Sequence, residues 1–147
     1  MMENSNSPAE KPKKIKLDFK DSKYATGRRK RSIAKVWIKK GNGNIHVNGM
    51  KMNEYFKRPV HQIIVTRPLE ITQVSSNYDV KCSVKGGGLS GQAGAIILGI
   101  SKALIAHDEN LKKNLKKDKL TTRDSRVVER KKYGHRKARR SFQFSKR

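Results

Sequence analysis

The chain has 147 residues, with 36 Lys and Arg against 12 Asp and Glu, which gives a formal net charge of +24. A protein this basic repels itself unless a polyanion neutralises it, and nucleic acid releases condensed counterions when it is bound. The scattered acids argue against general acid–base catalysis, and the single cysteine excludes a disulfide within the chain and favours a reducing compartment.

The chain divides into three parts by composition. Residues 1–22 are polar and Lys-rich, contain four acids, and lack an apolar run of signal-peptide length. We expect a disordered extension there. Residues 23–118 hold the apolar patterns and are expected to form one compact α+β body. Residues 119–147 are expected to form an extended basic tail.

The first pattern in the body indicates strands. Residues 32–39 alternate between apolar and polar side chains, which predicts a strand. Turn residues at 40–44 and apolar residues at 45–48 complete a predicted hairpin. Trp37 lies on the outward face and is expected to be partly buried, with stacking on a nucleobase as the alternative. The expected inward face consists of Ala34, Val36 and Ile38.

The next segment is expected to be helical. Residues 53–57 predict a single turn with Asn53 as its cap. Pro59 can open a second helix, and Pro68 is expected to interrupt or restart it. The apolar face expected for this helix consists of Val60, Ile63 and Ile64.

The clearest strand covers residues 78–85, where Val80, Cys82 and Val84 face one way. Cys82 is interpreted as a small core residue. Three glycines end this strand and the longest helix follows from residue 89. Asp108 starts a short second helix, where its charge suits the helix dipole. The apolar stripe expected for the long helix is Ala93, Ile96, Ile97, Ile100, Ala103 and Leu104.

Gly86, Gly88 and Gly91 match the spacing of a dinucleotide-binding fingerprint, between a strand and a helix. We discount cofactor binding because too little chain follows to build the required βαβαβ half. The alternatives are a flexible connection whose glycines allow tight geometry, and helix amides that touch a nucleic-acid phosphate. The four histidines do not have the spacing of metal ligands, so no metal is expected.

Two basic clusters flank the body. One is the run Arg28–Arg31, and the other is the tail, where twelve basic residues oppose two acids, a net charge of +10. The apolar residues of the tail keep no period, so no folding face can be drawn. No DNA-recognition helix is visible, and irregular basic arms suit folded RNA better. A DNA-packaging protein remains the rival, whereas the basic stretches lack the amphipathic pattern of a membrane helix.

Several motifs resemble one family. The run from Gly86 to Ala95, the opening residues 24–30 and the tail residues 122–132 are similar to ribosomal protein S-nine, the ninth protein of the small ribosomal subunit, in its bacterial type. The resemblance implies a four-stranded sheet with helices on one side and a left-handed βαβ crossover, a fold shared with domain two of ribosomal protein S-five. It implies a structural constituent of the small subunit and not an enzyme.

The resemblance also implies partners and contact residues. The partners would be small-subunit ribosomal RNA in the head, neighbouring head proteins and the P-site tRNA, with no cofactor and no membrane. The location would be the ribosome of a bacterium or of an organelle of bacterial ancestry, such as a mitochondrion. Contacts with the tRNA are expected from Lys146 and Arg147. Contacts with ribosomal RNA are expected from Arg28, Arg29, Lys30, Arg31, Arg123, Arg126, Arg130, Lys131, Lys132, Arg136, Lys137, Arg139 and Arg140.

Overall fold

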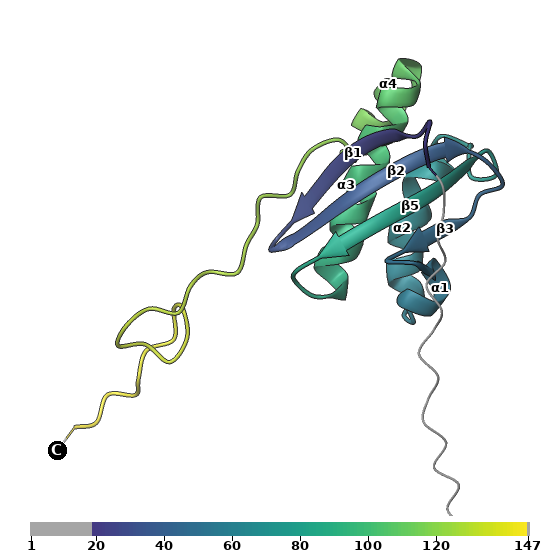
Figure 1. The fold of residues 1–147 in the computed structure, drawn as a ribbon. Helices are drawn as coiled ribbons and strands as arrows, with labels where there is room; N and C mark the ends of the chain where they lie inside the picture. Colours follow the sequence, from purple (N-terminus) through teal and green to yellow (C-terminus); the bar gives the residue numbers. More distant parts are fainter. Residues whose placement is uncertain (1–18, 147) are drawn as a thin grey trace, which may run out of the picture.

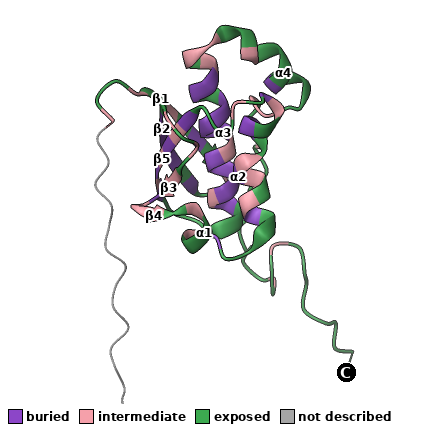
Figure 2. Ribbon diagram, turned by 90° about the vertical axis from the view of Figure 1, so that its right-hand side faces the viewer, coloured by how far each residue is buried: buried purple, intermediate pink, exposed green. Residues whose placement is uncertain are grey.

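The computed structural model describes residues 19–146 and has the predicted α+β class. The described residues form one five-stranded sheet, and helices cover one of its faces (Figure 1, Figure 2). The predicted disordered extension lies outside the described residues up to position 18. The elements are β1 (Lys23–Arg29), β2 (Ser32–Lys40), β3 (Ile45–Val47), β4 (Met50–Lys51), α1 (Met52–Tyr55), α2 (Pro59–Ile71), β5 (Tyr78–Lys85), α3 (Leu89–His107), η1 (Glu109–Leu111) and α4 (Lys112–Lys117).

The first two strands form a hairpin that sequence patterns did not predict. β1 pairs antiparallel with β2, and Arg29 lies opposite Ser32, so Lys30 and Arg31 make a two-residue turn. Lys30 has a left-handed φ of 52°, which costs a non-glycine residue about 1 kcal/mol. Three residues of the predicted basic cluster, Arg28, Lys30 and Arg31, are therefore exposed at the end of this hairpin. We call these three residues the hairpin tip.

The hairpin predicted between residues 32–39 and residues 45–48 is wrong, although both segments are strands. β5 lies between them, antiparallel to β2 and parallel to β3. The connection that was expected to close a hairpin binds β5 instead. The carboxylate of Asp79 accepts hydrogen bonds from the backbone amides of Asn42 at 3.0 Å and Asn44 at 2.8 Å. These bonds hold the ends of β2 and β3 one strand apart.

A tight turn after β3 adds a strand to the four that were predicted. Asn48 and Gly49 have φ values of 53° and 84°, which suits a two-residue hairpin turn. Val47 consequently pairs with Met50, and β4 becomes a short edge strand. The sheet order is β1-β2-β5-β3-β4. The parallel strands β3 and β5 are joined through α1 and α2, as a βαβ crossover requires, and its left hand stays a prediction.

The inward face of the sheet agrees with the prediction. Ala34, Val36 and Ile38 of β2 are fully buried, and the predicted inward residues of β5 are buried beside them. Cys82 is one of these, and burial raises the pKa of its thiol to about 12. The interpretation of Cys82 as a small core residue is confirmed.

The long helix α3 lies across this face. Its predicted apolar stripe is buried except for Ile97, which is half-buried. By length and composition α3 could cross a membrane, but most of it is buried inside the protein, where it packs against β1 and β2. Its apolar character therefore belongs to a core helix.

α2 begins at Pro59, as predicted, with proline in the first turn. The predicted inward face is wrong in part, because Val60 and Ile63 are 65% and 62% exposed. Pro68 does not interrupt the helix but lies buried within it. The true stripe was missed because it starts at a polar residue. It consists of His61, Val65, Pro68 and Leu69.

Two smaller helical regions differ in detail from the prediction. α1 begins after Lys51, so the predicted cap Asn53 lies inside the helix. The second short helix starts as predicted, with the Asp108 carboxylate accepting a hydrogen bond from the Asn110 amide at 3.0 Å. It begins as the 3-10 turn η1 and continues as α4, which buries Leu115 against the core.

Candidate nucleic-acid interface

Three segments that are far apart in the sequence meet at one end of the sheet (Figure 1). They are the hairpin tip, the glycine connection 86–88 between β5 and α3, and the first part of the tail. A groove of about 440 Å³ lies between them and is lined by Lys30, Arg31, Gly87, Gly88 and residues 127–131. Four of these residues are cations and one is an acid, so the groove favours an anionic ligand.

The glycine connection is held in place from both sides. Gly86 and Gly87 have φ values of 75° and 64°, a region that side chains with a Cβ rarely adopt. The carbonyl of Gly86 accepts hydrogen bonds from the Ser32 hydroxyl at 3.0 Å and from the side-chain amide of Gln92 at 3.2 Å. The tight geometry expected of this connection is present, and these bonds fasten it to β2 and α3.

Three glycines within α3 allow this helix to approach β1 and β2 closely. A Cβ on Gly91 would lie 2.8 Å from the Ser32 hydroxyl oxygen, and a Cβ on Gly94 would overlap the side chain of Arg29. A Cβ on Gly99 would lie 2.5 Å from Val36. Of the three glycines that resembled a dinucleotide fingerprint, Gly91 thus serves helix–sheet packing and Gly86 serves the turn after β5. The described strands contain one parallel pair, β3 and β5, which is not a βαβαβ half.

An ion pair fastens the start of the tail to the body. The guanidinium of Arg29 lies along α3 at Gly94 and reaches the carboxylate of Asp124 at 3.3 Å. Arg126 binds the same carboxylate through its side chain at 2.9 Å and through its backbone amide at 3.1 Å. Hydrogen bonds from Arg126, together with the charges of Arg126 and Arg29, hold the pKa of Asp124 well below its usual range. Asp124 is therefore ionised at neutral pH, and we call this contact the tail clasp.

Beyond the clasp the tail has no packed face. Residues 119–146 form no helix or strand, and Tyr133 and Phe144 are almost completely exposed. Glu129 pairs with Lys132 at 3.4 Å and with Arg139 at 2.8 Å. The second pair closes a loop in the tail, visible in yellow-green in Figure 1. Such exposed pairs contribute about 0–1 kcal/mol each, so a phosphate can replace them.

Comparison with known proteins identifies the polyanion. Residues 27–147 match the family described as Ribosomal protein S9/S16, and this range includes the hairpin tip, the glycine connection and the tail. The chain belongs to this family. It is a ribosomal protein, an RNA-binding component of a ribonucleoprotein that works in translation. Family membership is consistent with a structural role and disfavours the DNA-packaging and dinucleotide alternatives.

The S9/S16 protein presents the predicted RNA-binding residues in two groups. Arg28, Lys30 and Arg31 are exposed at the hairpin tip, whereas Arg29 turns back to the tail clasp. Arg147 lies outside the described residues. Among residues 19–146, no group of three His, Cys, Asp or Glu side chains could hold a metal ion. The predicted contact residues of the tail that the structure describes are all exposed, namely Arg123, Arg126, Arg130, Lys131, Lys132, Arg136, Lys137, Arg139, Arg140 and Lys146.

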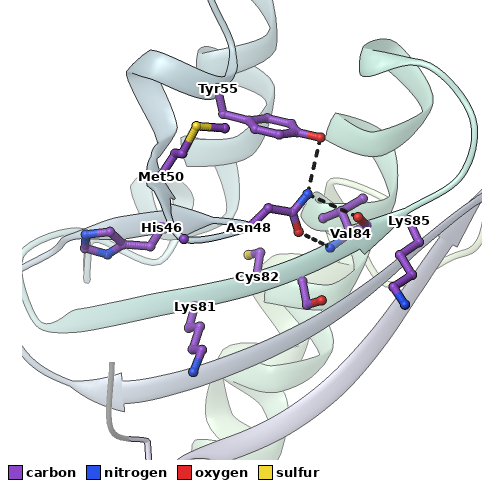
Figure 3. Close-up of a pocket in the computed structure, with 10 residues that line it drawn as sticks. His46, Asn48, Met50, Tyr55, Lys81, Cys82, Val84 and Lys85 are labelled. Carbon is purple, nitrogen blue, oxygen red and sulfur yellow. Dashed lines mark hydrogen bonds between the residues drawn. The ribbon is translucent and has the colours of Figure 1, made fainter. Parts of the chain in front are cut away.

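Sequence reasoning missed a polar network of the S9/S16 protein beside a second groove, of about 640 Å³ (Figure 3). The Asn48 carboxamide accepts a hydrogen bond from the Val84 amide at 2.8 Å and donates one to the Val84 carbonyl at 3.2 Å. It thereby provides hydrogen-bond partners for the backbone of β5 beyond the end of β3. Tyr55 donates to Gln92 at 2.8 Å and ties the same region to α3. The Asn48-Gly49 pair was the available signal, because it marks a turn.

Proposed function

We propose that this S9/S16 protein binds ribosomal RNA in the head of the small subunit, beside neighbouring head proteins. The hairpin tip holds the body on the RNA, and the tail cations neutralise phosphates along a path through it. The last residues, Lys146 and Arg147, reach the tRNA in the P site. In this proposal the protein acts as a structural and positioning component and catalyses no reaction.

The observation that carries the proposal is the electrostatic state of the tail. Its two acids are both bound by neighbouring cations, through the tail clasp and through the pairs of Glu129. The remaining cations of the tail, up to Lys146, are exposed and have no acidic partner in the tail sequence. Such a segment is stabilised when phosphates replace water and counterions around it. Arginine adds two-pronged hydrogen bonds to phosphate oxygens and stacking on bases.

The tail clasp also sets how far the tail can extend. With its start fixed at Asp124, the residues that follow span on the order of 75 Å when fully extended. Opening the loop closed by Glu129 and Arg139 is required to use this length. A contact far from the body is therefore within reach of the tail.

Sedimentation tests the RNA part of the proposal. Lysate run on a sucrose gradient at elevated salt should carry the full-length protein with the small subunit, because many phosphate contacts and a folded body hold it there. A matched variant with the tail cations from Arg130 to Arg140 changed to glutamine should dissociate at lower salt. The proposal would be refuted if the protein did not sediment with the small subunit or if it sedimented with the chromosome.

Removal of the last two residues tests the tRNA part. Subunits assembled with a chain that lacks Lys146 and Arg147 should sediment normally but retain P-site tRNA less tightly in a filter-binding assay. The control replaces Lys116 and Lys117 of α4 with glutamine, which removes the same charge from the body. Equal tRNA retention in the truncated, control and wild-type subunits would leave the protein with a scaffolding role alone.

A further inference from the structure

The face of the sheet opposite the helices carries a second group of cations and aromatic rings. Figure 2 shows the sheet with its helices on one side only. Because side chains alternate along strands, the residues between the buried ones all point to this open face. Strand register places Tyr24, Trp37, Lys81 and His46 in one row across β1, β2, β5 and β3.

Aromatic rings form a platform on this open face. Tyr24 and Trp37 lie directly opposite each other on β1 and β2, with ring centroids 5.3 Å apart. Tyr24 is 49% exposed, and Trp37 is half-buried. Phe19, just before β1, lies 5.7 Å from the ammonium group of Lys81. Exposed rings of this kind are the surfaces on which unpaired bases stack.

A hollow adjoins the platform. It has a volume of about 320 Å³ and is lined by Ile33, Lys35, Trp37, Ser83 and Lys85. The indole and the Ile33 side chain, which is 44% exposed, supply an apolar floor. The Ser83 hydroxyl offers a hydrogen-bonding group. Lys35 lies directly opposite Ser83 on β2, and Lys85 lies two residues further along β5. Apolar walls with a few polar groups suit a flat heterocycle of nucleobase size.

The charge of the open face is strongly positive. The one acid that the described strands place on this face, Asp79, already accepts hydrogen bonds from two backbone amides of the β2–β3 connection. Figure 3 shows Lys81 and Lys85 extending from the same side of β5. Lysine is depleted in protein–protein interfaces, so this composition favours a phosphate backbone over a protein partner. The cations of the face, apart from the hairpin tip, are Lys35, Lys39, Lys81 and Lys85.

We propose that the open face binds an unpaired stretch of RNA, with one base stacked on Trp37 in the hollow and adjacent phosphates bound by Lys35 and Lys85. The proposal rests on RNA as the partner of this chain, but it uses a surface separate from the hairpin tip and the tail. It assigns the body a single-strand binding function, whereas the tail binds phosphates without regard to base stacking.

The test uses Trp37, the single tryptophan of the chain, as a local probe in the full-length protein. A single-stranded oligouridine of about eight nucleotides should quench its fluorescence in a saturable titration, because a stacked base quenches an indole. A duplex RNA of equal length should bind the tail but leave the fluorescence unchanged, since its bases are stacked within the helix. Fluorescence anisotropy of labelled oligonucleotide reports total binding, including binding to the tail.

Charge variants distinguish the face from the tail. The double variant Lys35→Gln/Lys85→Gln should weaken the quenching titration and lower its salt slope by about 1.4, that is, by about 0.7 for each lost phosphate contact. The control Lys112→Gln/Lys113→Gln removes the same charge from α4 and should leave the quenching midpoint near that of the wild type. All four lysines are exposed, so the variants are expected to fold.

Two results would overturn the proposal. One is oligonucleotide binding by anisotropy without quenching of Trp37, which would place all RNA contact on the tail and hairpin tip and leave the proposed function intact. The other is a Trp37 that acrylamide cannot reach in the free protein and can reach once residues 1–18 are removed. That result would make the chain's own N-terminal segment, or a protein in its place, the occupant of the face.

Discussion

Replacement of Gly27 by alanine tests whether α3 can lie this close to β1 only because Gly27 has no side chain. A Cβ at this position would overlap the carbonyl oxygen of Ala95 and lie 2.6 Å from the amide nitrogen of Gly99. Ordinary contacts begin at 3.4 Å, so the helix has to move by about 1.5 Å away from the Ala95 oxygen. Both obstructing atoms belong to the backbone and cannot rotate away.

The expected cost is at the upper end of the range for overpacking. Inserting an atom into a packed core costs typically about 1–3 kcal/mol, and we expect about 3 kcal/mol here because a whole helix is displaced. With a urea m-value of about 1–3 kcal/mol/M, the unfolding midpoint should fall by at least about 1 M. The fluorescence of Trp37 on the neighbouring strand provides the assay.

Gly88→Ser is the matched control. In the described part of the chain nothing lies within 4 Å of a Cβ placed on Gly88, and serine is a favoured residue at the N-cap that Gly88 occupies. The control should keep the stability of the wild type or slightly exceed it. A Gly27→Ala protein that unfolds within about 0.5 kcal/mol of the wild type would refute the close-approach argument.

Three further predictions concern single side chains. Burial raises the pKa of Cys82 from 9.0 to about 12, so the unfolded chain releases this proton at lower pH than the folded protein. The free energy of unfolding should therefore fall more steeply in the wild type than in Cys82→Ala between about pH 9 and pH 12. The same pH dependence of the unfolding free energy in both proteins would contradict this. Asn48→Ala should lower the free energy of unfolding by about 1–3 kcal/mol in urea titrations, because the amide and carbonyl of Val84 lose their partners; an unchanged midpoint would mean that water replaces them. Asp124→Asn should speed limited trypsin cleavage at the start of the tail, because Arg29 loses its anionic partner, while the unfolding midpoint of the body changes little; an unchanged cleavage rate would show that the tail clasp does not restrain the tail.

Burial on one face is what made two strands predictable. A strand with one buried face imposes a period of two on its sequence, and residues 32–39 and 78–85 follow it without exception. The same pattern carries no information about which strand lies next to which. The interpretation of residues 40–44 as a hairpin turn failed because Asp79, a residue distant in sequence, binds that connection.

The buried face of α2 could not be read from hydropathy. Its stripe includes His61 and Pro68, whereas the apolar residues Val60 and Ile63 face outward. Packing against α3 selects the face, and it places the ring of a polar residue, His61, inward. The His61 ring lies 5.8 Å from that of Phe56, a contact that sequence periodicity does not contain.

The basic residues of the candidate site were predictable as a group but not individually. Charge runs at 28–31 and along the tail stand out in the sequence. The residues of the first run differ in role because side chains alternate along a strand. Arg29 points inward to α3 and Asp124, whereas its neighbours are exposed. The open-face lysines were hidden in the same way, because they alternate with buried residues along β2 and β5 instead of forming a run.

The central position of β5 has a consequence for the order of folding during synthesis. The β1–β2 hairpin is local and can form as soon as its residues leave the exit tunnel, but the free edge of β2 has no partner until residues 78–85 emerge. Until then the nascent chain exposes an unpaired strand edge, the kind of surface that pairs with other chains. β3 waits for the same late strand, and α3, which packs mainly on β1 and β2, follows that strand in the chain. We therefore expect the body to fold in one late step, with the basic tail appearing only after the sheet that carries it is complete.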